Sequence, residues 1–192
     1  MNKIIKYYKL IIIFMIILSC FFLIYTMTIN KYADMSKYKT YSSDMDNMYI
    51  NYTVKQLDKD INDKQSRIVY FGFKDCPYCN DLLPILTDIN SHFKQEIYYI
   101  DTRKNPDWKS NLDIDDYDLL LTHIGKYLNK DEDNKLHLYV PTIIFINEGK
   151  IIKFISPYEY DVDEGLPRDI ELDMYHDIDT SFQKYMEVTS EK

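Results

Sequence analysis

Two cysteines stand two residues apart in "FGFKDCPYCNDLLPIL", residues 71–86, directly after an apolar run and at the start of a helical pattern. A thiolate at a helix N-terminus is stabilised by backbone N–H groups that lack intrahelical partners and by the positive end of the helix dipole. Cys76 would lie at that end and attack a disulfide, while Cys79, one turn further in, would resolve the mixed disulfide. Pro77 suits the first helical turn, where no N–H is needed. The pattern predicts a redox-active dithiol.

Two other roles for the cysteine pair are a metal site and a structural disulfide. A zinc site needs three or four protein ligands, and this pair supplies two. A disulfide across so short a loop would be strained and easily reduced, which favours a redox role over a structural staple. The four histidines lack the spacing of the known zinc motifs, so no metal ligands are predicted: His92, His123, His137 and His176.

The elements next to the cysteines predict a parallel crossover. "RIVYFGF", residues 67–73, has the β-branched and aromatic composition of a strand, and "EIYYID", residues 96–101, has it again. Between them, apolar residues recur at helical spacing: Leu82, Leu83, Leu86, Ile89 and Phe93. Strand, helix and strand in this order are typical of a right-handed β-α-β unit.

The remaining elements complete an α/β domain. "MYINYT", residues 48–53, predicts a strand, and Thr53 with Gln56 fits a capping box that opens a helix. "YVPTIIFINEGKIIKFI" predicts a hairpin that turns at "NEGK". Two further helical faces are expected, one from Leu120, Ile124, Tyr127 and Leu128 and one from Tyr175, Ile178, Phe182 and Tyr185. We therefore expect a central mixed β-sheet flanked by helices.

The composition allows one sizeable core and disfavours nucleic acid. The chain has 192 residues, 46% of them hydrophobic, and a net charge of −8, whereas binding to phosphates needs clustered Lys and Arg. Acidic residues are dense at 113–118 and 131–133, where a solvated face is expected.

The N-terminus predicts a membrane segment. Three lysines precede residues 10–29, which carry no charge and are about long enough to cross the ~30 Å hydrocarbon layer as a helix. The basic flank places the N-terminus in the cytoplasm and the rest of the chain outside the cell. We therefore expect a signal-anchor at residues 1–30, a linker at 31–47 and a folded domain at 48–192. A cleaved signal peptide is one alternative, and a lipoprotein anchored at Cys20, within the lipobox-like "ILSC", is another.

Three further positions carry a resemblance to the thioredoxin superfamily. Pro84 follows Cys79 by five residues, as a proline does in the active-site helix of that family. Pro141, in "VPT", matches the family's cis proline, and Gly149, eight residues later, matches its hairpin glycine. The resemblance covers about residues 48–188 and implies a thioredoxin-like fold.

The resemblance also implies how the site would work. An exposed Cys76 sulfur would face a cis peptide at Pro141, and the backbone of Val140 would pair with an extended substrate segment. Pro77 and Tyr78 would shape the substrate-binding loop. No cofactor is implied, because the dithiol itself is oxidised and reduced.

The sequence departs from thioredoxins proper at two positions. Asp75 stands where they carry a Trp, and Tyr70 stands where they carry a buried Asp. "CPYC" is the motif typical of glutaredoxins. The stretch "YFGFKDCPYC" is most similar to extracytoplasmic thioredoxin-like proteins of Gram-positive bacteria, including the bacteriocin transport accessory proteins.

The expected function is a membrane-anchored, extracytoplasmic thiol-disulfide oxidoreductase. Its partners would be secreted or surface protein or peptide thiols and disulfides, together with a membrane or extracellular redox partner. The direction of electron flow depends on a reduction potential that these residues do not fix. The alternative is a non-catalytic scaffold for an exporter or its peptide cargo, with the acidic region 107–133 as its contact surface.

Overall fold

The structure is a computed structural model in which two compact units are distinguished, Met1–Tyr32 and Ala33–Lys192. It describes residue 7 and residues 11–22, 31–103, 112, 114–131, 133–156 and 168–190, with the side chains of 168–171 left out. Of the acidic region expected at 107–133, residues 107–111, 113 and 132 lie outside this description.

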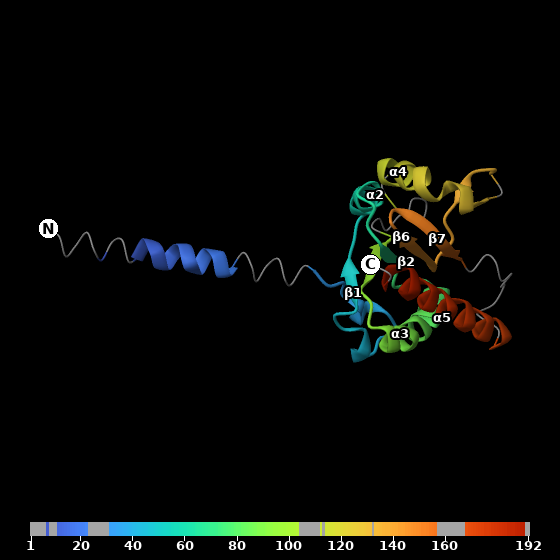
Figure 1. The fold of residues 1–192 in the computed structure, drawn as a ribbon, viewed down its shortest axis with the longest axis horizontal. Helices are drawn as coiled ribbons and strands as arrows, with labels where there is room; N and C mark the ends of the chain where they lie inside the picture. Colours follow the sequence, from blue (N-terminus) through green and yellow to red (C-terminus); the bar gives the residue numbers. More distant parts are fainter. Residues whose placement is uncertain are drawn as a thin grey trace. The chain divides into compact units, whose positions relative to one another are not determined.

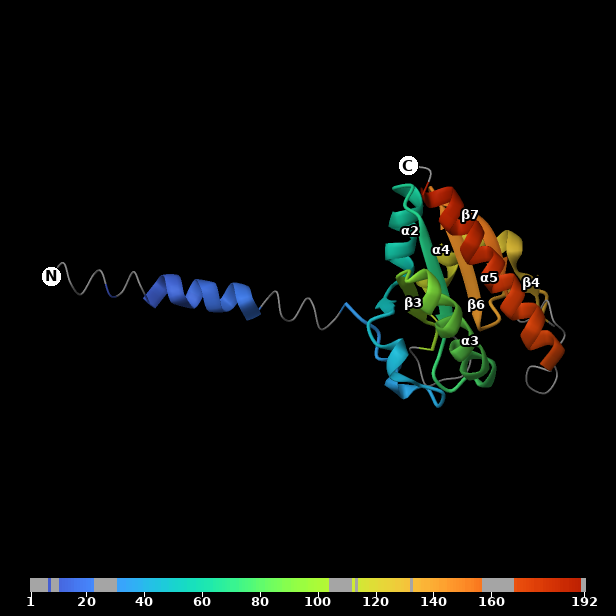
Figure 2. The same cartoon turned by 60° about the horizontal axis from the view of Figure 1, so that its bottom comes forward.

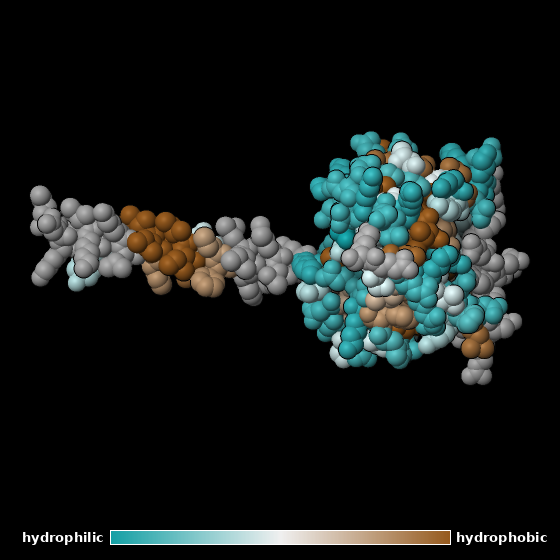
Figure 3. Space-filling view, viewed as in Figure 1, coloured by the Kyte–Doolittle hydropathy of each residue, from teal (hydrophilic) through white to brown (hydrophobic). Residues whose placement is uncertain are grey.

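The described part of the first unit is a helix over residues 11–22. Its large apolar side chains are all exposed, and they colour this segment hydrophobic in Figure 3. Among the described residues, no helix has both the length and the apolar character of a membrane span. Residue 10 and residues 23–29 of the predicted span lie outside the described residues. The membrane segment therefore stays a prediction.

The second unit is built on a five-stranded mixed sheet. Its strands run in the order β1 (Tyr49–Asn51), β3 (Ile97–Asp101), β2 (Arg67–Gly72), β6 (Thr142–Asn147) and β7 (Lys150–Ile155). The first three are parallel, and β6 and β7 are each antiparallel to the strand before them in this order. The predicted crossover and the predicted hairpin are both present.

Helices cover both faces of this sheet (Figures 1 and 2). On one face lie α2 (Val54–Asn62) and α4 (Ile114–Ile124), and on the other lie α3 (Pro77–Phe93) and α5 (Arg168–Ser190). Together with the strand order, this arrangement is an α/β thioredoxin-like fold, as expected.

Alternation along the central strand β2 explains why both faces are covered. Ile68 and Tyr70 pack into the core on the α3 and α5 side, while Val69 and Phe71 pack into the core on the α2 and α4 side. All four side chains are buried, because helices cover both faces of this central strand and leave it no solvated face. Tyr70 therefore points toward the helix that carries the cysteines.

Several short elements were not expected from the sequence. Three 3-10 turns, η1, η2 and η3, and a small antiparallel pair, β4 and β5, have too few residues to show a period. Their bounds are Met35–Lys37, Ser43–Met45, Gly125–Tyr127, Asn129–Lys130 and Leu136–His137.

The segment expected as a linker, residues 31–47, contributes to the core of the second unit. Met35, Tyr38 and Met45 are each no more than 4% exposed and belong to the same buried cluster as both cysteines of the motif. The 3-10 turns space these apolar residues irregularly, so the sequence shows neither helical nor strand periodicity there. The second unit accordingly begins at Ala33 and not at residue 48.

The final helix, α5, buries a slightly different face from the predicted one. Ile178, Phe182 and Tyr185 are buried as expected, but Tyr175 is 38% exposed. Met174, 1% exposed, takes its place, because it lies four residues before Ile178 on the same helical stripe.

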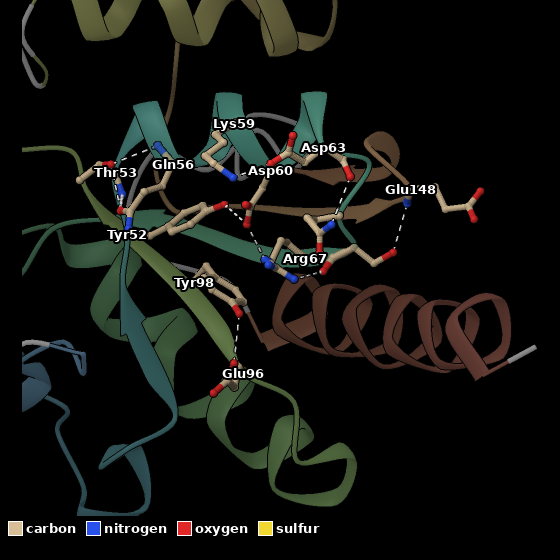
Figure 4. A network of polar contacts seen from close by, with 12 residues as sticks. Tyr52, Thr53, Gln56, Lys59, Asp60, Asp63, Arg67, Glu96, Tyr98 and Glu148 are labelled. Atoms are coloured by element: carbon tan, nitrogen blue, oxygen red, sulfur yellow. Dashed lines mark hydrogen bonds and ion pairs between the residues drawn. The ribbon is translucent and has the colours of Figure 1, made fainter. Parts of the chain in front are cut away.

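A polar network fastens the end of the sheet away from the cysteines (Figure 4). The Arg67 Nε donates to the Asp60 carboxylate over 2.7 Å, and the Tyr52 hydroxyl donates to the same oxygen over 2.8 Å. The Ser66 hydroxyl accepts the Glu148 N–H over 3.1 Å. These contacts join α2, the start of β2 and the β6–β7 turn, and so fix the strand that leads into the cysteine motif.

Glycine at position 149 is required by the same turn, so its replacement is a test of the fold. Gly149 has a φ of +74°, and a Cβ there would lie 2.2 Å from the Ile61 carbonyl oxygen. Gly149→Ala is expected to lower the free energy of unfolding by more than about 2 kcal/mol in denaturant titration. The exposed neighbour variant Lys150→Ala should change it by less than about 0.5 kcal/mol. Equal midpoints for Gly149→Ala and the wild-type protein would contradict this account of the turn.

Candidate redox site

The first turn of α3 places the sulfur of Cys76 against the helix N-terminus. Cys76 is the N-cap residue, and its Sγ accepts the Cys79 N–H over 3.1 Å. Pro77 occupies the first helical position, where its missing N–H leaves no bond unmade. No disulfide bond joins Cys76 and Cys79 in this structure. The predicted start of the helix at the cysteine pair is confirmed.

The hairpin brings the predicted proline to the same place. The Val140–Pro141 peptide bond is cis, as the resemblance implied. The Cys76 thiol donates to the Val140 carbonyl oxygen over 3.7 Å, so the segment just before β6 touches the sulfur. Pro77 is exposed and Tyr78 is half-buried, and Tyr78 packs against the cluster that holds both cysteines. All six residues of the predicted site therefore gather around the start of α3.

The sulfur of Cys76 is less accessible than expected. The residue is 3% exposed and Cys79 is 0% exposed, where the sequence predicted an exposed attacking sulfur. The half-buried side chains of Tyr78 and Val140 pack against the buried cluster that contains Cys76, and the Val140 carbonyl oxygen lies 3.7 Å from the sulfur. A helix N-terminus faces outward only if the neighbouring loops leave it open, which local sequence does not specify. A substrate must therefore reach Cys76 past these two residues.

The surroundings of Cys76 nevertheless favour its thiolate. The pKa of Cys76 is lowered, first by the Cys79 side chain, and further by the N–H groups of Cys79 and Tyr78 and by the charge of Arg103. Burial opposes these effects but does not overcome them. Cys76 is therefore the thiol of the pair that ionises first.

The pKa of Cys79 is shifted the other way. Burial raises it well above the usual value, and the hydrogen bond and charge of Cys76 raise it further. The Tyr70 phenol lies close enough to lower the pKa of Cys79, and among the described residues its buried hydroxyl has no partner in hydrogen-bond geometry. That hydroxyl can donate to the Cys79 thiolate when this forms. Tyr70 thus stands behind the second cysteine at the position where thioredoxins carry a buried acid.

Arg103 is a site residue that the sequence analysis missed. It lies two residues after β3, and its guanidinium stacks on the Phe73 ring at 3.5 Å from the centroid. Phe73 precedes Cys76 by three residues, so this stacking places a permanent positive charge near the thiol. In the sequence, Arg103 was visible only as the start of "RKNP" after the predicted strand. Its place near Cys76 follows from the pairing of β3 with β2, which brings the ends of these two strands together.

Asn80 is the second missed residue. Its side-chain amide donates to the carbonyl oxygens of Lys74 and Cys76 over 2.9 and 2.8 Å. At 6% exposed it is one of few buried polar side chains in the described residues, and it follows Cys79 directly. An asparagine inside an apolar helical pattern was the only signal in the sequence.

Among the described residues, no group of three or more His, Cys, Asp and Glu side chains could hold a metal ion.

No protein-family model and no curated protein matches this chain. The solved structures that match it include two thioredoxins. Thioredoxin O2 from Arabidopsis thaliana, in the oxidised state, shares 13% identity over 70% of this chain and 95% of that chain, with a TM-score of 0.39. Thioredoxin from Aeropyrum pernix shares 18% identity over 55% of this chain and 72% of that chain, with a TM-score of 0.35. The strand order and the packing of helices on both faces of the sheet define the fold.

The charge of Arg103 is testable through the ionisation of Cys76. Arg103→Gln should raise the pKa of Cys76, because the variant removes a cation that favours the thiolate, and thiolate absorbance across pH would measure it. Alkylation of Cys76 at neutral pH should slow roughly two- to fivefold, the effect of about 0.5–1 kcal/mol. Arg103→Lys keeps the charge and should retain most of the wild-type rate. A titration of Arg103→Gln that matches the wild-type protein would remove Arg103 from the site.

Proposed function

We propose that this protein is a membrane-anchored, extracytoplasmic thiol-disulfide oxidoreductase. One observation carries the proposal: the Cys76 sulfur accepts an N–H at the start of α3 and contacts the carbonyl before the cis proline Pro141. A nucleophile, a resolving thiol and a backbone segment able to hold a substrate meet at this point.

The chemistry is a pair of thiol-disulfide exchanges. The Cys76 thiolate attacks one sulfur of a substrate disulfide, a mixed disulfide forms, and the other substrate sulfur leaves as a thiolate. Cys79 then loses its proton and attacks the Cys76 sulfur, which releases the second substrate sulfur as a thiolate. The substrate has gained two electrons, and the protein holds a Cys76–Cys79 disulfide. The reverse sequence oxidises a substrate dithiol, and a redox partner protein restores the starting state.

The two cysteines suit these two steps because their pKa shifts differ in sign. A lowered pKa makes Cys76 the thiol that ionises first, and the thiolate is the form that attacks. A raised pKa keeps Cys79 protonated until the mixed disulfide has formed on Cys76 and removed that negative charge. The Tyr70 hydroxyl then stabilises the second thiolate. Premature attack by Cys79 is thereby disfavoured.

The surface around Cys76 supports a protein or peptide as the substrate. The exposed Pro77 and the half-buried Tyr78 form one side of the approach to the sulfur, and Val140 forms the other. An extended peptide lying across Val140 can pair with its backbone and place a cysteine at Cys76. Because Cys76 is only 3% exposed, these side chains must shift when the substrate arrives.

The proposed location rests on the apolar N-terminal segment. The helix over residues 11–22 carries no charged residue and exposes large apolar side chains at positions 11–18, 21 and 22, which a hydrocarbon layer would cover. The preceding lysines favour an outward-facing domain. The bacteriocin transport accessory proteins, which the stretch around the cysteines resembles, point to an exporter or its peptide cargo as the client.

Trapping tests the catalytic proposal. Cys79→Ser cannot resolve a mixed disulfide, so clients should remain attached to Cys76 and migrate as reductant-sensitive adducts on gels. Cys76→Ser should form no adducts and should lose turnover of a dithiol or disulfide substrate. Both variants should be made with Cys20→Ser, so that no third thiol contributes. Turnover unchanged by Cys76→Ser would end the proposal.

The 3% exposure of Cys76 favours a second candidate, a non-catalytic scaffold that holds an exporter or its cargo. The double variant Cys76→Ser/Cys79→Ser separates the two roles. Full biological function in that variant indicates a scaffold, and lost function with an unchanged melting temperature indicates redox chemistry.

The mode of anchoring is tested at Cys20. With an uncleaved signal-anchor, Cys20→Ser should leave the protein in the membrane fraction and its mass on gels unchanged. Lipid attached to Cys20 in membrane extracts, and release of the Cys20→Ser variant from the membrane, would instead identify a lipoprotein.

A further inference from the structure

Lys39 and Thr40, in the segment that the sequence marked as a linker, bond directly to the helix that carries the dithiol. We propose that Asn80 is a positioning residue, through which residues 38–40 hold the Cys76 loop in the geometry that stabilises its thiolate. The inference deepens the proposed function and rests on it. It assigns a role in the active site to a segment that the sequence marked as a linker.

The amide group of Asn80 fixes the loop from inside the helix. Its Nδ2 donates to the carbonyl oxygens of Lys74 and Cys76, at 2.9 and 2.8 Å, so both donor positions of the amide are used. The Cys76 carbonyl also accepts the Asn80 backbone N–H, at 3.1 Å. The backbone of Cys76 is therefore held by two bonds from one residue, which sets the direction of its Cα–Cβ bond toward the Cys79 N–H.

The oxygen atoms of Asn80 are held by the preceding segment. The side-chain Oδ1 accepts the Lys39 N–H over 2.8 Å, and the backbone carbonyl accepts the Thr40 hydroxyl over 2.7 Å. The second bond exists because Pro84, four residues further along α3, has no N–H to donate to that carbonyl. The helix proline thus leaves an acceptor open, and Thr40 fills it.

A separate contact holds the segment on the core beneath the cysteines. The Tyr38 side chain is 4% exposed, and its hydroxyl lies 3.0 Å from that of Tyr99 on β3. The Tyr99 ring stacks on that of Tyr70 at 5.9 Å between centroids. Residues 38–40 are thus attached both to the sheet behind Cys79 and to the helix that begins at Cys76.

Loss of these bonds should weaken the stabilisation of the Cys76 thiolate. Without the amide of Asn80, the Lys74 carbonyl loses its bond to this residue, and the Cys76 carbonyl keeps only the bond from the backbone N–H of residue 80. The N–H···S contact of 3.1 Å should then loosen. A less stabilised thiolate destabilises the reduced protein relative to its disulfide, so the pair becomes more reducing.

A matched pair of variants in one helix tests the role of Asn80. In the reduced full-length protein, Asn80→Ala should slow the alkylation of Cys76 about tenfold when it is measured at a pH below the pKa of Cys76. This is the effect expected if the charge-assisted bond from the Cys79 N–H to the Cys76 thiolate is lost. The equilibrium of the variant with glutathione should shift toward the Cys76–Cys79 disulfide by the same factor. Asn90→Ala is the control, because Asn90 is also buried in α3 but bonds Gln95 at the other end of the helix. It should lower the melting temperature without changing either readout. Unchanged readouts in folded Asn80→Ala would overturn the inference.

A second pair tests the contribution of the preceding segment without altering α3. Thr40→Val keeps the shape of the side chain but removes the hydroxyl, and it should shift both readouts in the direction of Asn80→Ala by a smaller factor. Thr40→Ser should restore them. Thr122→Val, which removes an exposed hydroxyl that bonds Leu119 in α4, should have no effect. If Thr40→Val titrates as the wild-type protein does, residues 38–40 have no part in positioning the thiol.

These readouts use only the protein and glutathione, so they are independent of any client. A shifted titration in Asn80→Ala with no trapped client in Cys79→Ser would keep the positioning role and reject the catalytic proposal. Trapped clients in Cys79→Ser together with an unshifted titration in Asn80→Ala would keep the catalytic proposal and reject the positioning role.

Discussion

The hydrogen bond from the Cys79 N–H to the Cys76 sulfur is the interaction on which the site depends. It exists because a buried strand, β2, ends just before the helix α3 begins, and because Pro77 sets the first helical turn. Every other contact of the site acts on this geometry. The Val140 carbonyl touches the same sulfur, Arg103 adds charge nearby, and Asn80 holds the backbone that carries it.

The two thiols differ because one lies at the helix terminus and the other lies inside the core. Both are nearly inaccessible, yet the pKa of Cys76 is lowered and that of Cys79 is raised. The Cys79 side chain, oriented N–H groups and a cation together outweigh burial at the first position, and nothing comparable outweighs it at the second. The division between an attacking and a resolving thiol thus follows from position in the fold, although the two residues are of the same type.

Residues 33–47, which the sequence marked as a linker, are part of the domain and support this chemistry. Met35, Tyr38 and Met45 fill the core on the α3 side, and the backbone between them reaches Asn80. Because Pro84 leaves the Asn80 carbonyl open, the helix needs a partner from outside, and Thr40 supplies it. A proline that the sequence marks as a family feature therefore also creates the attachment point of a segment that the sequence does not mark as structured.

Local patterns alone predicted most of the scaffold. The alternating run of β2, the capping box at Thr53, the turn at Gly149 and the helix start at Cys76 each depend on neighbours within a few residues, so the sequence encodes them directly. The tertiary structure decided the rest: the cover over Cys76, the approach of Arg103, and the docking of residues 33–47. These features depend on contacts between segments that lie far apart in the chain, and the residue pattern within one segment does not specify which distant segment it will contact.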